Sequence, residues 1–285
     1  MGERIAWVTD SSGCLDVELE QNPDVYVVPL IVMINGKEYL DGVDIHPEEM
    51  HRMMKEDKVA PKTSQPAVGT FLDLFKKLAG EYDRIIAIHL SSRLSGTYSS
   101  SLQAAQMLDF PIMVIDSLLI SYPMTFLIKK MMAYINEGLS LEEARGKLER
   151  FRDSNELYVL IGSLEQLHRS GRMSATSFIL GSMLNIKPII SIEKGALEIR
   201  EKTRNEKRAK TKIFSLFKAA ADRGTIKECY LLYGSAEEQT KGLKTQIHDL
   251  YPDMSVSAYP IGTAVGVHAG DKTLGISWFS DRSCI

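Results

Sequence analysis

Short apolar segments alternate with amphipathic segments along the first half of the chain. The apolar segments are rich in β-branched residues and end in polar or glycine-bearing stretches, which predicts buried strands at 4–10, 25–34, 84–90 and 111–116. Helical patterns begin near Pro47, Pro66 and Thr97. Strands that alternate with helices favour a mainly parallel sheet. Asn35-Gly36 predicts a hairpin turn, and hence an antiparallel excursion at one edge of that sheet.

In the second half of the chain, the sequence predicts two consecutive helices and then a series of strands. A long helix is expected around 124–136, and Ser140 with Glu143 predicts a capping box at the start of the next helix. Further strands are predicted at 158–163, 186–193, 196–204, 228–234, 255–261 and 273–279. Lys194-Gly195 is expected to turn one hairpin, which indicates a mixed sheet.

The length favours two α/β domains. At 285 residues the chain exceeds what one hydrophobic core usually supports. We place an N-terminal α/β domain at 1–155 and a C-terminal α/β domain at 156–285. A ligand cleft between them is the expected binding site.

Composition narrows the functional classes. Apolar and charged fractions of 44% and 25% are those of a soluble globular protein, and a formal net charge of -3 gives no reason to expect nucleic acid binding. Cys14, Cys229 and Cys284 have no spacing typical of a disulfide framework or a zinc site, so we expect no metal and a reducing, cytoplasmic location. No segment is long and apolar enough to predict a membrane anchor.

Two short segments carry many uncharged hydrogen-bond donors. KTSQP, residues 62–66, supplies Thr63 and Ser64, and SSRLSGTY, residues 91–98, supplies Ser95, Gly96 and Thr97. Hydroxyl groups donate hydrogen bonds, and glycine lets backbone N–H groups approach a ligand. The combination predicts an anion cradle that holds a carboxylate without attacking it.

The position of these segments supports that interpretation. In a parallel sheet, ligands bind outside the carboxyl ends of the strands, where 10–12, 91–96 and 116–117 are expected to lie. A helix that begins near Thr97 would add a favourable dipole for a negative group. Any one of these Ser or Thr residues, taken alone, is also explained by helix capping.

His268 and Arg172 are further candidates. His268 lies in a stretch rich in glycine and small residues, 260–270, where an imidazole could donate a hydrogen bond to a ligand. The simpler interpretation is a surface or loop histidine whose hydrogen bonds are made without a ligand. Arg172 either caps the preceding helix or supplies a cation to a buried carboxylate.

A basic run covers 202–212. Such a run usually forms a solvated face, and the alternatives are a docking patch for an acidic partner or a site near a phosphorylated product. Methionine and other apolar side chains of this chain suit either a buried core or the wall of a tunnel that holds a flexible hydrocarbon. The candidate tunnel walls are Leu118, Leu119, Phe126, Leu127, Phe178, Ile179 and Met183.

Seven motifs together resemble the DegV family. They are TDSS at 9–12, KTSQP, SSRLSGTY, DS at 116–117, GR at 171–172, KP at 187–188 and IGTAVGVHAG at 261–270. The resemblance covers nearly the whole chain and implies two α/β domains with a bound long-chain fatty acid and no other cofactor. It further implies a bacterial, non-catalytic lipid-binding subunit that presents the fatty acid to the separate catalytic subunit of a fatty acid kinase, with only transient membrane contact. Thr63, Ser95 and His268 would contact the carboxylate, with Arg172 nearby.

Two other functions fit the residues less well. A serine-dependent acyl hydrolase would use Ser95 as nucleophile and His268 as base, with Asp116 or Asp10 orienting it, but SSRLSGTY is not a GxSxG nucleophile elbow. A phosphate cradle for a nucleotide or sugar phosphate would be expected to carry GxGxxG or a P-loop motif, and the chain has neither.

Overall fold

The computed structural model describes residues 3–56, 60–173 and 186–280 of the chain. They form two compact units: Met1–Lys130 with Gly262–Val267, and Met131–Ile261 with His268–Ile285. Two helices, α5 (Tyr122–Asn136) and α10 (Thr263–Ala269), contribute residues to both units. The predicted boundary at 155 lies further along the chain, at the start of strand β8 (Asn155–Leu160). Strands β1 to β7 precede that point and the strands of the second unit follow it.

A four-stranded sheet lies at the centre of the first unit. Its order is β2 (Val25–Val28), β1 (Ile5–Asp10), β6 (Arg84–His89) and β7 (Ile112–Asp116), and every neighbouring pair is parallel, as predicted. From β1 the chain continues to β2 on one side, whereas from β6 it continues to β7 on the other. The topological switch point therefore lies between β1 and β6, where ligands of parallel sheets usually bind.

Residues 25–34 form two strands, so the prediction of one strand was wrong. Pro29 follows β2, and its ring fixes φ and removes a backbone donor, which ends the strand. The next strand, β3 (Ile31–Ile34), pairs with β4 (Lys37–Leu40) and β5 (Lys62–Ser64) in a separate antiparallel sheet. Asn35 and Gly36 turn the β3–β4 hairpin with φ of 52° and 79°, as a tight hairpin turn requires.

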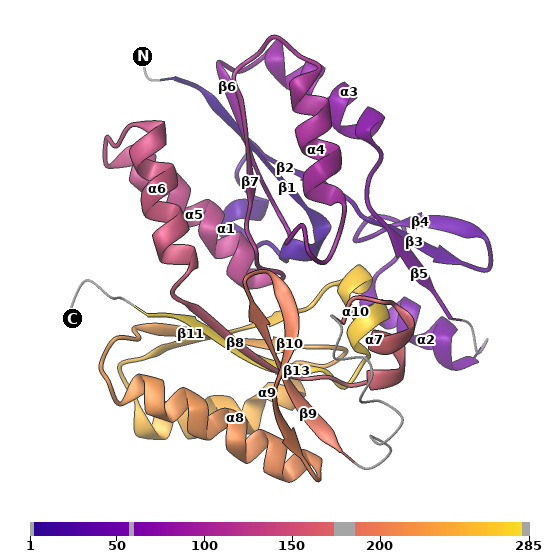
Figure 1. Cartoon of the computed structure of the whole chain (residues 1–285), viewed down its shortest axis with the longest axis vertical. Helices are drawn as coiled ribbons and strands as arrows, with labels where there is room; N and C mark the ends of the chain where they lie inside the picture. Colours follow the sequence, from indigo (N-terminus) through magenta and orange to yellow (C-terminus); the bar gives the residue numbers. More distant parts are fainter. Residues whose placement is uncertain (1–2, 57–59, 174–185, 281–285) are drawn as a thin grey trace. The chain divides into compact units, whose positions relative to one another are not determined.

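Helices cover both sheets of the first unit. Helices α3 (Val68–Ala79) and α4 (Thr97–Gln106) lie side by side against the parallel sheet (Figure 1). Phe71, Phe75 and Leu78 of α3 are fully buried there, because they recur at helical spacing. Met50 of α2 (Pro47–Glu56) packs with Ala264 and Val267 of α10 and with β3 in a second apolar cluster. The short helix α1 (Val17–Glu20) follows the 3₁₀ turn at Ser11–Gly13.

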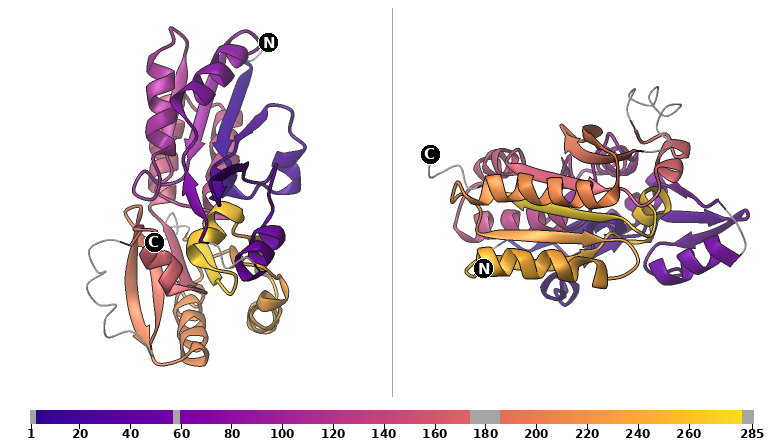
Figure 2. Two further views of the ribbon diagram at one scale, coloured as in Figure 1. Left: turned by 90° about the vertical axis from the view of Figure 1, so that its right-hand side faces the viewer. Right: turned by 90° about the horizontal axis from the view of Figure 1, so that it is seen from below.

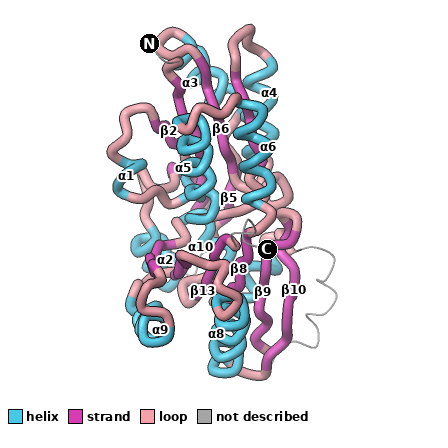
Figure 3. The backbone as a smooth tube through the Cα atoms, turned by 90° about the vertical axis from the view of Figure 1, so that its left-hand side faces the viewer, coloured by secondary structure: helices cyan, strands magenta, loops and turns pink. Residues whose placement is uncertain are grey.

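The second unit is built on a six-stranded mixed sheet, which confirms the prediction. Its order is β10 (Ala196–Thr203), β9 (Lys187–Glu193), β8, β13 (Leu274–Phe279), β11 (Glu228–Tyr233) and β12 (Ser255–Pro260). The β11–β12 pair is parallel and the other neighbours are antiparallel. Lys194 and Gly195, with φ of 48° and 83°, turn the predicted β9–β10 hairpin, which Figure 3 traces.

Two helices pack on one face of this sheet. Helix α8 (Glu206–Ala221) and helix α9 (Glu238–Leu250) share one apolar cluster with the strands and run alongside them (Figure 2). Trp278 of β13 is fully buried in that cluster and contacts Phe217 of α8. The predicted capping box of Ser140 and Glu143 begins α6 (Leu141–Arg152), and α7 (Leu164–Arg169) follows β8.

Gly234 lets two backbone segments of the second unit touch. A Cβ atom at this position would lie 2.2 Å from the carbonyl oxygen of Asp271, and no side chain could move to relieve that clash. Ser235 donates from its backbone N–H to the same oxygen at 2.9 Å. Gly242, in the interior of α9, is different because a Cβ there would meet no atom within 4 Å.

We therefore expect opposite effects from the same substitution at these two glycines. Gly234→Ala should lower the free energy of unfolding by about 1–3 kcal/mol, since the backbone must shift. Gly242→Ala should raise it by up to about 1 kcal/mol, since alanine favours the helix. Urea unfolding of both variants measures the difference, and equal effects would show that the close approach at Gly234 does not constrain the fold.

Candidate ligand-binding site

The loops after β6 and β7 are joined by hydrogen bonds at the carboxyl end of the parallel sheet. The carboxylate of Asp116, the last residue of β7, accepts from the backbone N–H groups of Ser92 at 3.1 Å and Leu118 at 3.0 Å. The N–H of Ser91 donates to the carbonyl of Leu119 at 2.9 Å. The structure thus brings together the loops in which sequence analysis placed the candidate site.

Ser95 and Thr97 form a pair of hydroxyl groups at the start of α4. Their oxygens are 2.9 Å apart, and Ser95 Oγ also accepts from the backbone N–H of Thr97 at 3.3 Å. Thr97 is fully buried, whereas Ser95 is partly exposed. With Thr97 donating to Ser95, the proton of Ser95 can point outward to a ligand. Ser95 is therefore the group able to contact a ligand, and Thr97 supports it.

The two predicted donor segments meet at Gly96. A Cβ atom at Gly96 would lie 2.9 Å from Nε2 of Gln65, so the glutamine amide of KTSQP rests against the glycine of SSRLSGTY. Sequence analysis did not single out Gln65, since nothing local distinguishes it. Thr63 and Ser64 lie two residues and one residue before it on β5, a strand that was not predicted, and both are partly exposed.

The carboxylates considered for a catalytic triad have other partners. Asp116 accepts the two backbone bonds described above. Asp10 accepts from His89 Nδ1 at 3.1 Å and from the backbone N–H of Leu90 at 3.0 Å. Sequence analysis missed His89, although a histidine inside the apolar run 84–90 is a polar signal in a buried strand.

His268 lies in the last turn of helix α10, so its placement in a loop was wrong. The helix forms because Ala264 and Val267 join an apolar cluster and because Asp41, distant in sequence, accepts from the N–H of Thr263 at 3.2 Å. Burial, with a smaller contribution from the charge of Arg172, lowers the pKa of His268 to about 4. At neutral pH the imidazole is therefore uncharged and acts as a dipolar hydrogen-bonding group.

Arg172 lies shortly after the C-terminus of α7, beyond its C-cap residue Ser170. Its Nη1 donates to the carbonyl of Ser170, the C-cap residue, at 2.5 Å. This is the capping role considered from the sequence, and it uses one of the five N–H groups of the guanidinium. Within the second unit, its charge acts on His268.

The basic run at 202–212 forms ion pairs with acidic neighbours. Lys210 pairs with Glu206 at 2.7 Å and Lys212 with Glu201 at 3.1 Å. Side chains of the run are largely exposed, as in a solvated face.

The apolar candidates fall into two groups. Leu119, Phe126 and Leu127 are buried, and Leu118 is partly exposed with a left-handed φ of 51°. Phe178, Ile179 and Met183 lie outside the described residues, as does Cys284. Whether the first group forms a tunnel wall therefore stays a prediction.

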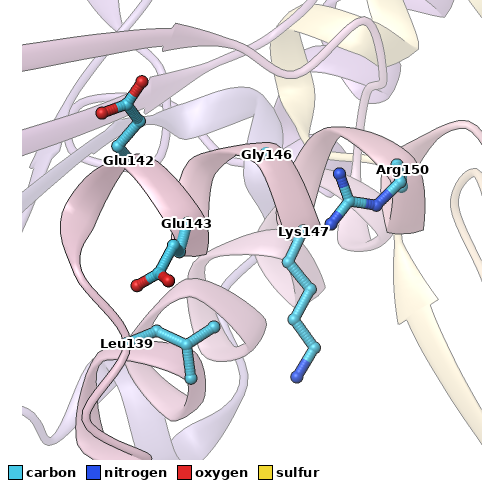
Figure 4. Close-up of a pocket in the computed structure, with 6 residues that line it drawn as sticks. All are labelled: Leu139, Glu142, Glu143, Gly146, Lys147 and Arg150. Carbon is cyan, nitrogen blue, oxygen red and sulfur yellow. The ribbon is translucent and has the colours of Figure 1, made fainter.

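A hollow of about 440 Å³ on the second unit has a different character. It follows α6 and is lined by Leu139, Glu142, Glu143, Gly146, Lys147 and Arg150, which Figure 4 draws as sticks. Glu143 accepts from Ser140, and Lys147 pairs with Glu137 at 3.3 Å. None of the predicted site residues lines this hollow.

Within the part of the chain that the structure describes, no helix is both long and apolar enough to cross a membrane. In the same residues, no three His, Cys, Asp or Glu side chains are grouped so that they could hold a metal ion.

Comparison with known proteins gives consistent matches along the chain. The family model described as "Uncharacterised protein, DegV family" matches residues 4–281. The DegV domain-containing protein lin2658 of Listeria innocua is 31% identical over 98% of this chain and 99% of its own length. DegV domain-containing protein SA1258 of Staphylococcus aureus is 34% identical over 94% of this chain and 96% of its own.

Solved structures match equally well. A DegV family protein from Thermus thermophilus, described by its fatty acid binding, has a TM-score of 0.88 and 30% identity over 97% of this chain and 99% of its own. DegV from Bacillus subtilis, described as a fatty acid binding protein, has a TM-score of 0.90 and 28% identity over 98% of this chain and 100% of its own.

His268→Asn should make the ligand-free protein less sensitive to acid. The pKa of His268 falls from 6.5 in the unfolded chain to about 4 in the folded one. Between these values the unfolded state binds more protons, so stability is complete above the unfolded pKa and decreases as pH falls toward the folded one. Urea midpoints on either side of this window should differ less in the variant than in the wild type. Asn at the exposed His248 is the control, and an equal change in both variants would contradict the assignment.

Proposed function

The chain belongs to the DegV family, and we propose that it binds a long-chain fatty acid and presents the carboxylate to a separate kinase subunit. The observation that carries the proposal is the hydroxyl pair of Ser95 and Thr97 at the switch point of the parallel sheet. The fatty acid binding named for the similar proteins of Thermus thermophilus and Bacillus subtilis supports the choice of ligand.

In this proposal the first unit supplies the head group with uncharged donors. Ser95 donates its outward proton to one carboxylate oxygen, and Thr97 strengthens that bond by donating to Ser95 in turn. Thr63, Ser64 and the backbone at Gly96 are the other donors of the first unit. His268 and Arg172 remain predicted contacts of the same carboxylate, with His268 acting as a neutral donor.

The tail and the head group have separate tasks. Burying hydrocarbon contributes about 0.8 kcal/mol per methylene, so a tail of roughly fourteen carbons contributes on the order of 11 kcal/mol before the costs of binding. A hydrogen bond to a carboxylate contributes about 1.5–3 kcal/mol. The tail therefore determines how tightly the ligand is held, and the hydroxyl groups determine which end is presented.

Presentation requires no reaction on this chain. In acyl phosphate formation, a carboxylate oxygen attacks the γ-phosphorus of ATP held by the kinase, and ADP leaves. The lipid-binding subunit has only to keep the carboxylate ionised and oriented. We propose that this exchange takes place in the cytoplasm, with membrane contact limited to loading and release of the lipid.

The class of ligand can be tested directly. The purified protein is denatured, extracted with organic solvent, and its lipid identified and quantified by mass spectrometry. We expect close to one fatty acid per chain. A protein that carries no lipid and whose melting temperature does not respond to added fatty acid contradicts the proposal, since a ligand of the folded state must stabilise it.

Ser95→Ala should separate retention from presentation. Loss of one hydrogen bond to a carboxylate should raise the Kd for a fatty acid by about 10- to 100-fold, while the tail still holds the ligand. Acyl phosphate production by the kinase subunit should fall further than occupancy does. Ser99→Ala, at an exposed position on the same helix, is the matched control.

Two results would argue against this role for Ser95. Unchanged acyl phosphate production by Ser95→Ala would remove it from the head-group site. Hydrolysis of a chromogenic acyl ester by the wild type, abolished in Ser95→Ala, would favour the acyl hydrolase instead.

A further inference from the structure

A buried polar chain connects the two strands at the switch point to helix α4. Asp10 ends β1, His89 ends β6, and Ser101 lies in α4. His89 Nδ1 lies 3.1 Å from Asp10 Oδ2, and His89 Nε2 lies 2.9 Å from Ser101 Oγ. The side chains of Asp10 and His89 are fully buried, and Ser101 has no exposed surface.

The hydrogen-bond partners of Asp10 fix the direction of each bond. Its Oδ1 accepts from the N–H of Ser12 at 3.2 Å and from the Ser12 hydroxyl at 2.5 Å, and its Oδ2 accepts from the N–H of Leu90 at 3.0 Å. A carboxylate that accepts from all these groups can only accept from His89 as well, which places a proton on Nδ1. With the ring proton on Nδ1, Nε2 accepts and the Ser101 hydroxyl donates to it.

The order Ser, His, Asp is that of a catalytic triad, but its surroundings are those of a core. The ring of Phe71 packs edge-on against His89, with ring centres 5.1 Å apart. Phe71 and Ser101 are both fully buried, so no substrate reaches the serine oxygen. The arrangement therefore positions other groups and does not itself attack a substrate.

We propose that Asp10, His89 and Ser101 are positioning residues for the head-group donors at the start of α4. Ser101 lies four residues after Thr97, on the same face of the helix. Its bond to His89 therefore holds this face of α4 at the ends of β1 and β6. Thr97 in turn bonds Ser95, so the position of the outward Ser95 proton depends on a bond one helical turn away.

This inference rests on the proposed binding of a fatty acid, and its test compares two ligands with the same tail. Affinities for hexadecanoic acid and for 1-hexadecanol are measured on delipidated protein by displacement of a fluorescent probe. The wild type is compared with Ser101→Ala, with Ser101→Cys and with Ser100→Ala, a buried neighbour outside the polar chain. Ser101→Cys keeps the side-chain size and weakens the bond to His89, so it remains informative if Ser101→Ala does not fold.

We expect the preference for the acid over the alcohol to fall about tenfold in Ser101→Ala and by less in Ser101→Cys, because a displaced donor loses a charge-assisted bond. Ser100→Ala should keep the preference of the wild type. A merely structural role for Ser101 would weaken both ligands equally, and that result, or no change, overturns the inference while leaving fatty acid binding intact. A wild type that binds neither ligand overturns the proposed function as well.

A second measurement does not depend on the ligand. The nitrogen chemical shifts of His89 in the wild-type protein report which ring nitrogen carries the proton. We expect the Nδ1–H tautomer. A protonated Nε2 in neutral His89 would reverse the bond to Ser101 and contradict the proposed polar chain.

Discussion

The Asp10 carboxylate holds the ends of two parallel strands together. Because it is buried, it requires hydrogen bonds in place of water, and it obtains them from the turn after β1, from the backbone after β6 and from His89. A fold that moved any one of these donors away would leave the buried carboxyl group short of a hydrogen bond. This requirement makes the switch point of the sheet a fixed platform for the loop that contains Ser95.

The candidate site residues of the two units differ in their charge and in how that charge is controlled. In the first, the predicted site is built from hydroxyl and amide groups, which donate without charge. In the second, Arg172 is bonded to the carbonyl of Ser170 and His268 is kept neutral, with its pKa lowered to about 4. A histidine that looks from the sequence like a pH-sensitive cation is therefore a neutral dipole across the physiological range.

Sequence patterns correctly predicted the turns, caps and helices that neighbouring residues determine. The Asn35-Gly36 and Lys194-Gly195 turns, the Ser140–Glu143 capping box and the helix starting at Thr97 follow from neighbouring residues. The misplacement of His268 has a distant cause, since the helix that carries it is capped by Asp41. Likewise, β5 is a strand only because Thr63 and Ser64 pair with β3. A polar segment of three residues shows no alternation of apolar and polar side chains from which a strand could be predicted.

The candidate site residues show the same difference between features set by neighbouring residues and features set by distant ones. Hydroxyl-rich segments and strand ends can be recognised in the sequence, so Ser95, Gly96 and Thr97 were singled out as candidates. Gln65 and His89 were not, because their importance comes from what the fold places beside them: Gly96 for one, Asp10 and Ser101 for the other.

The uncharged pair of Ser95 and Thr97 has a chemical consequence for any acid bound there. A metal ion bound to the carboxylate would withdraw electron density from its oxygens and make it a poorer nucleophile. Hydroxyl groups steer the same oxygens while leaving most of their basicity intact. Under the proposed function, this weak polarisation leaves the free carboxylate oxygen able to attack the γ-phosphorus of ATP on the kinase subunit.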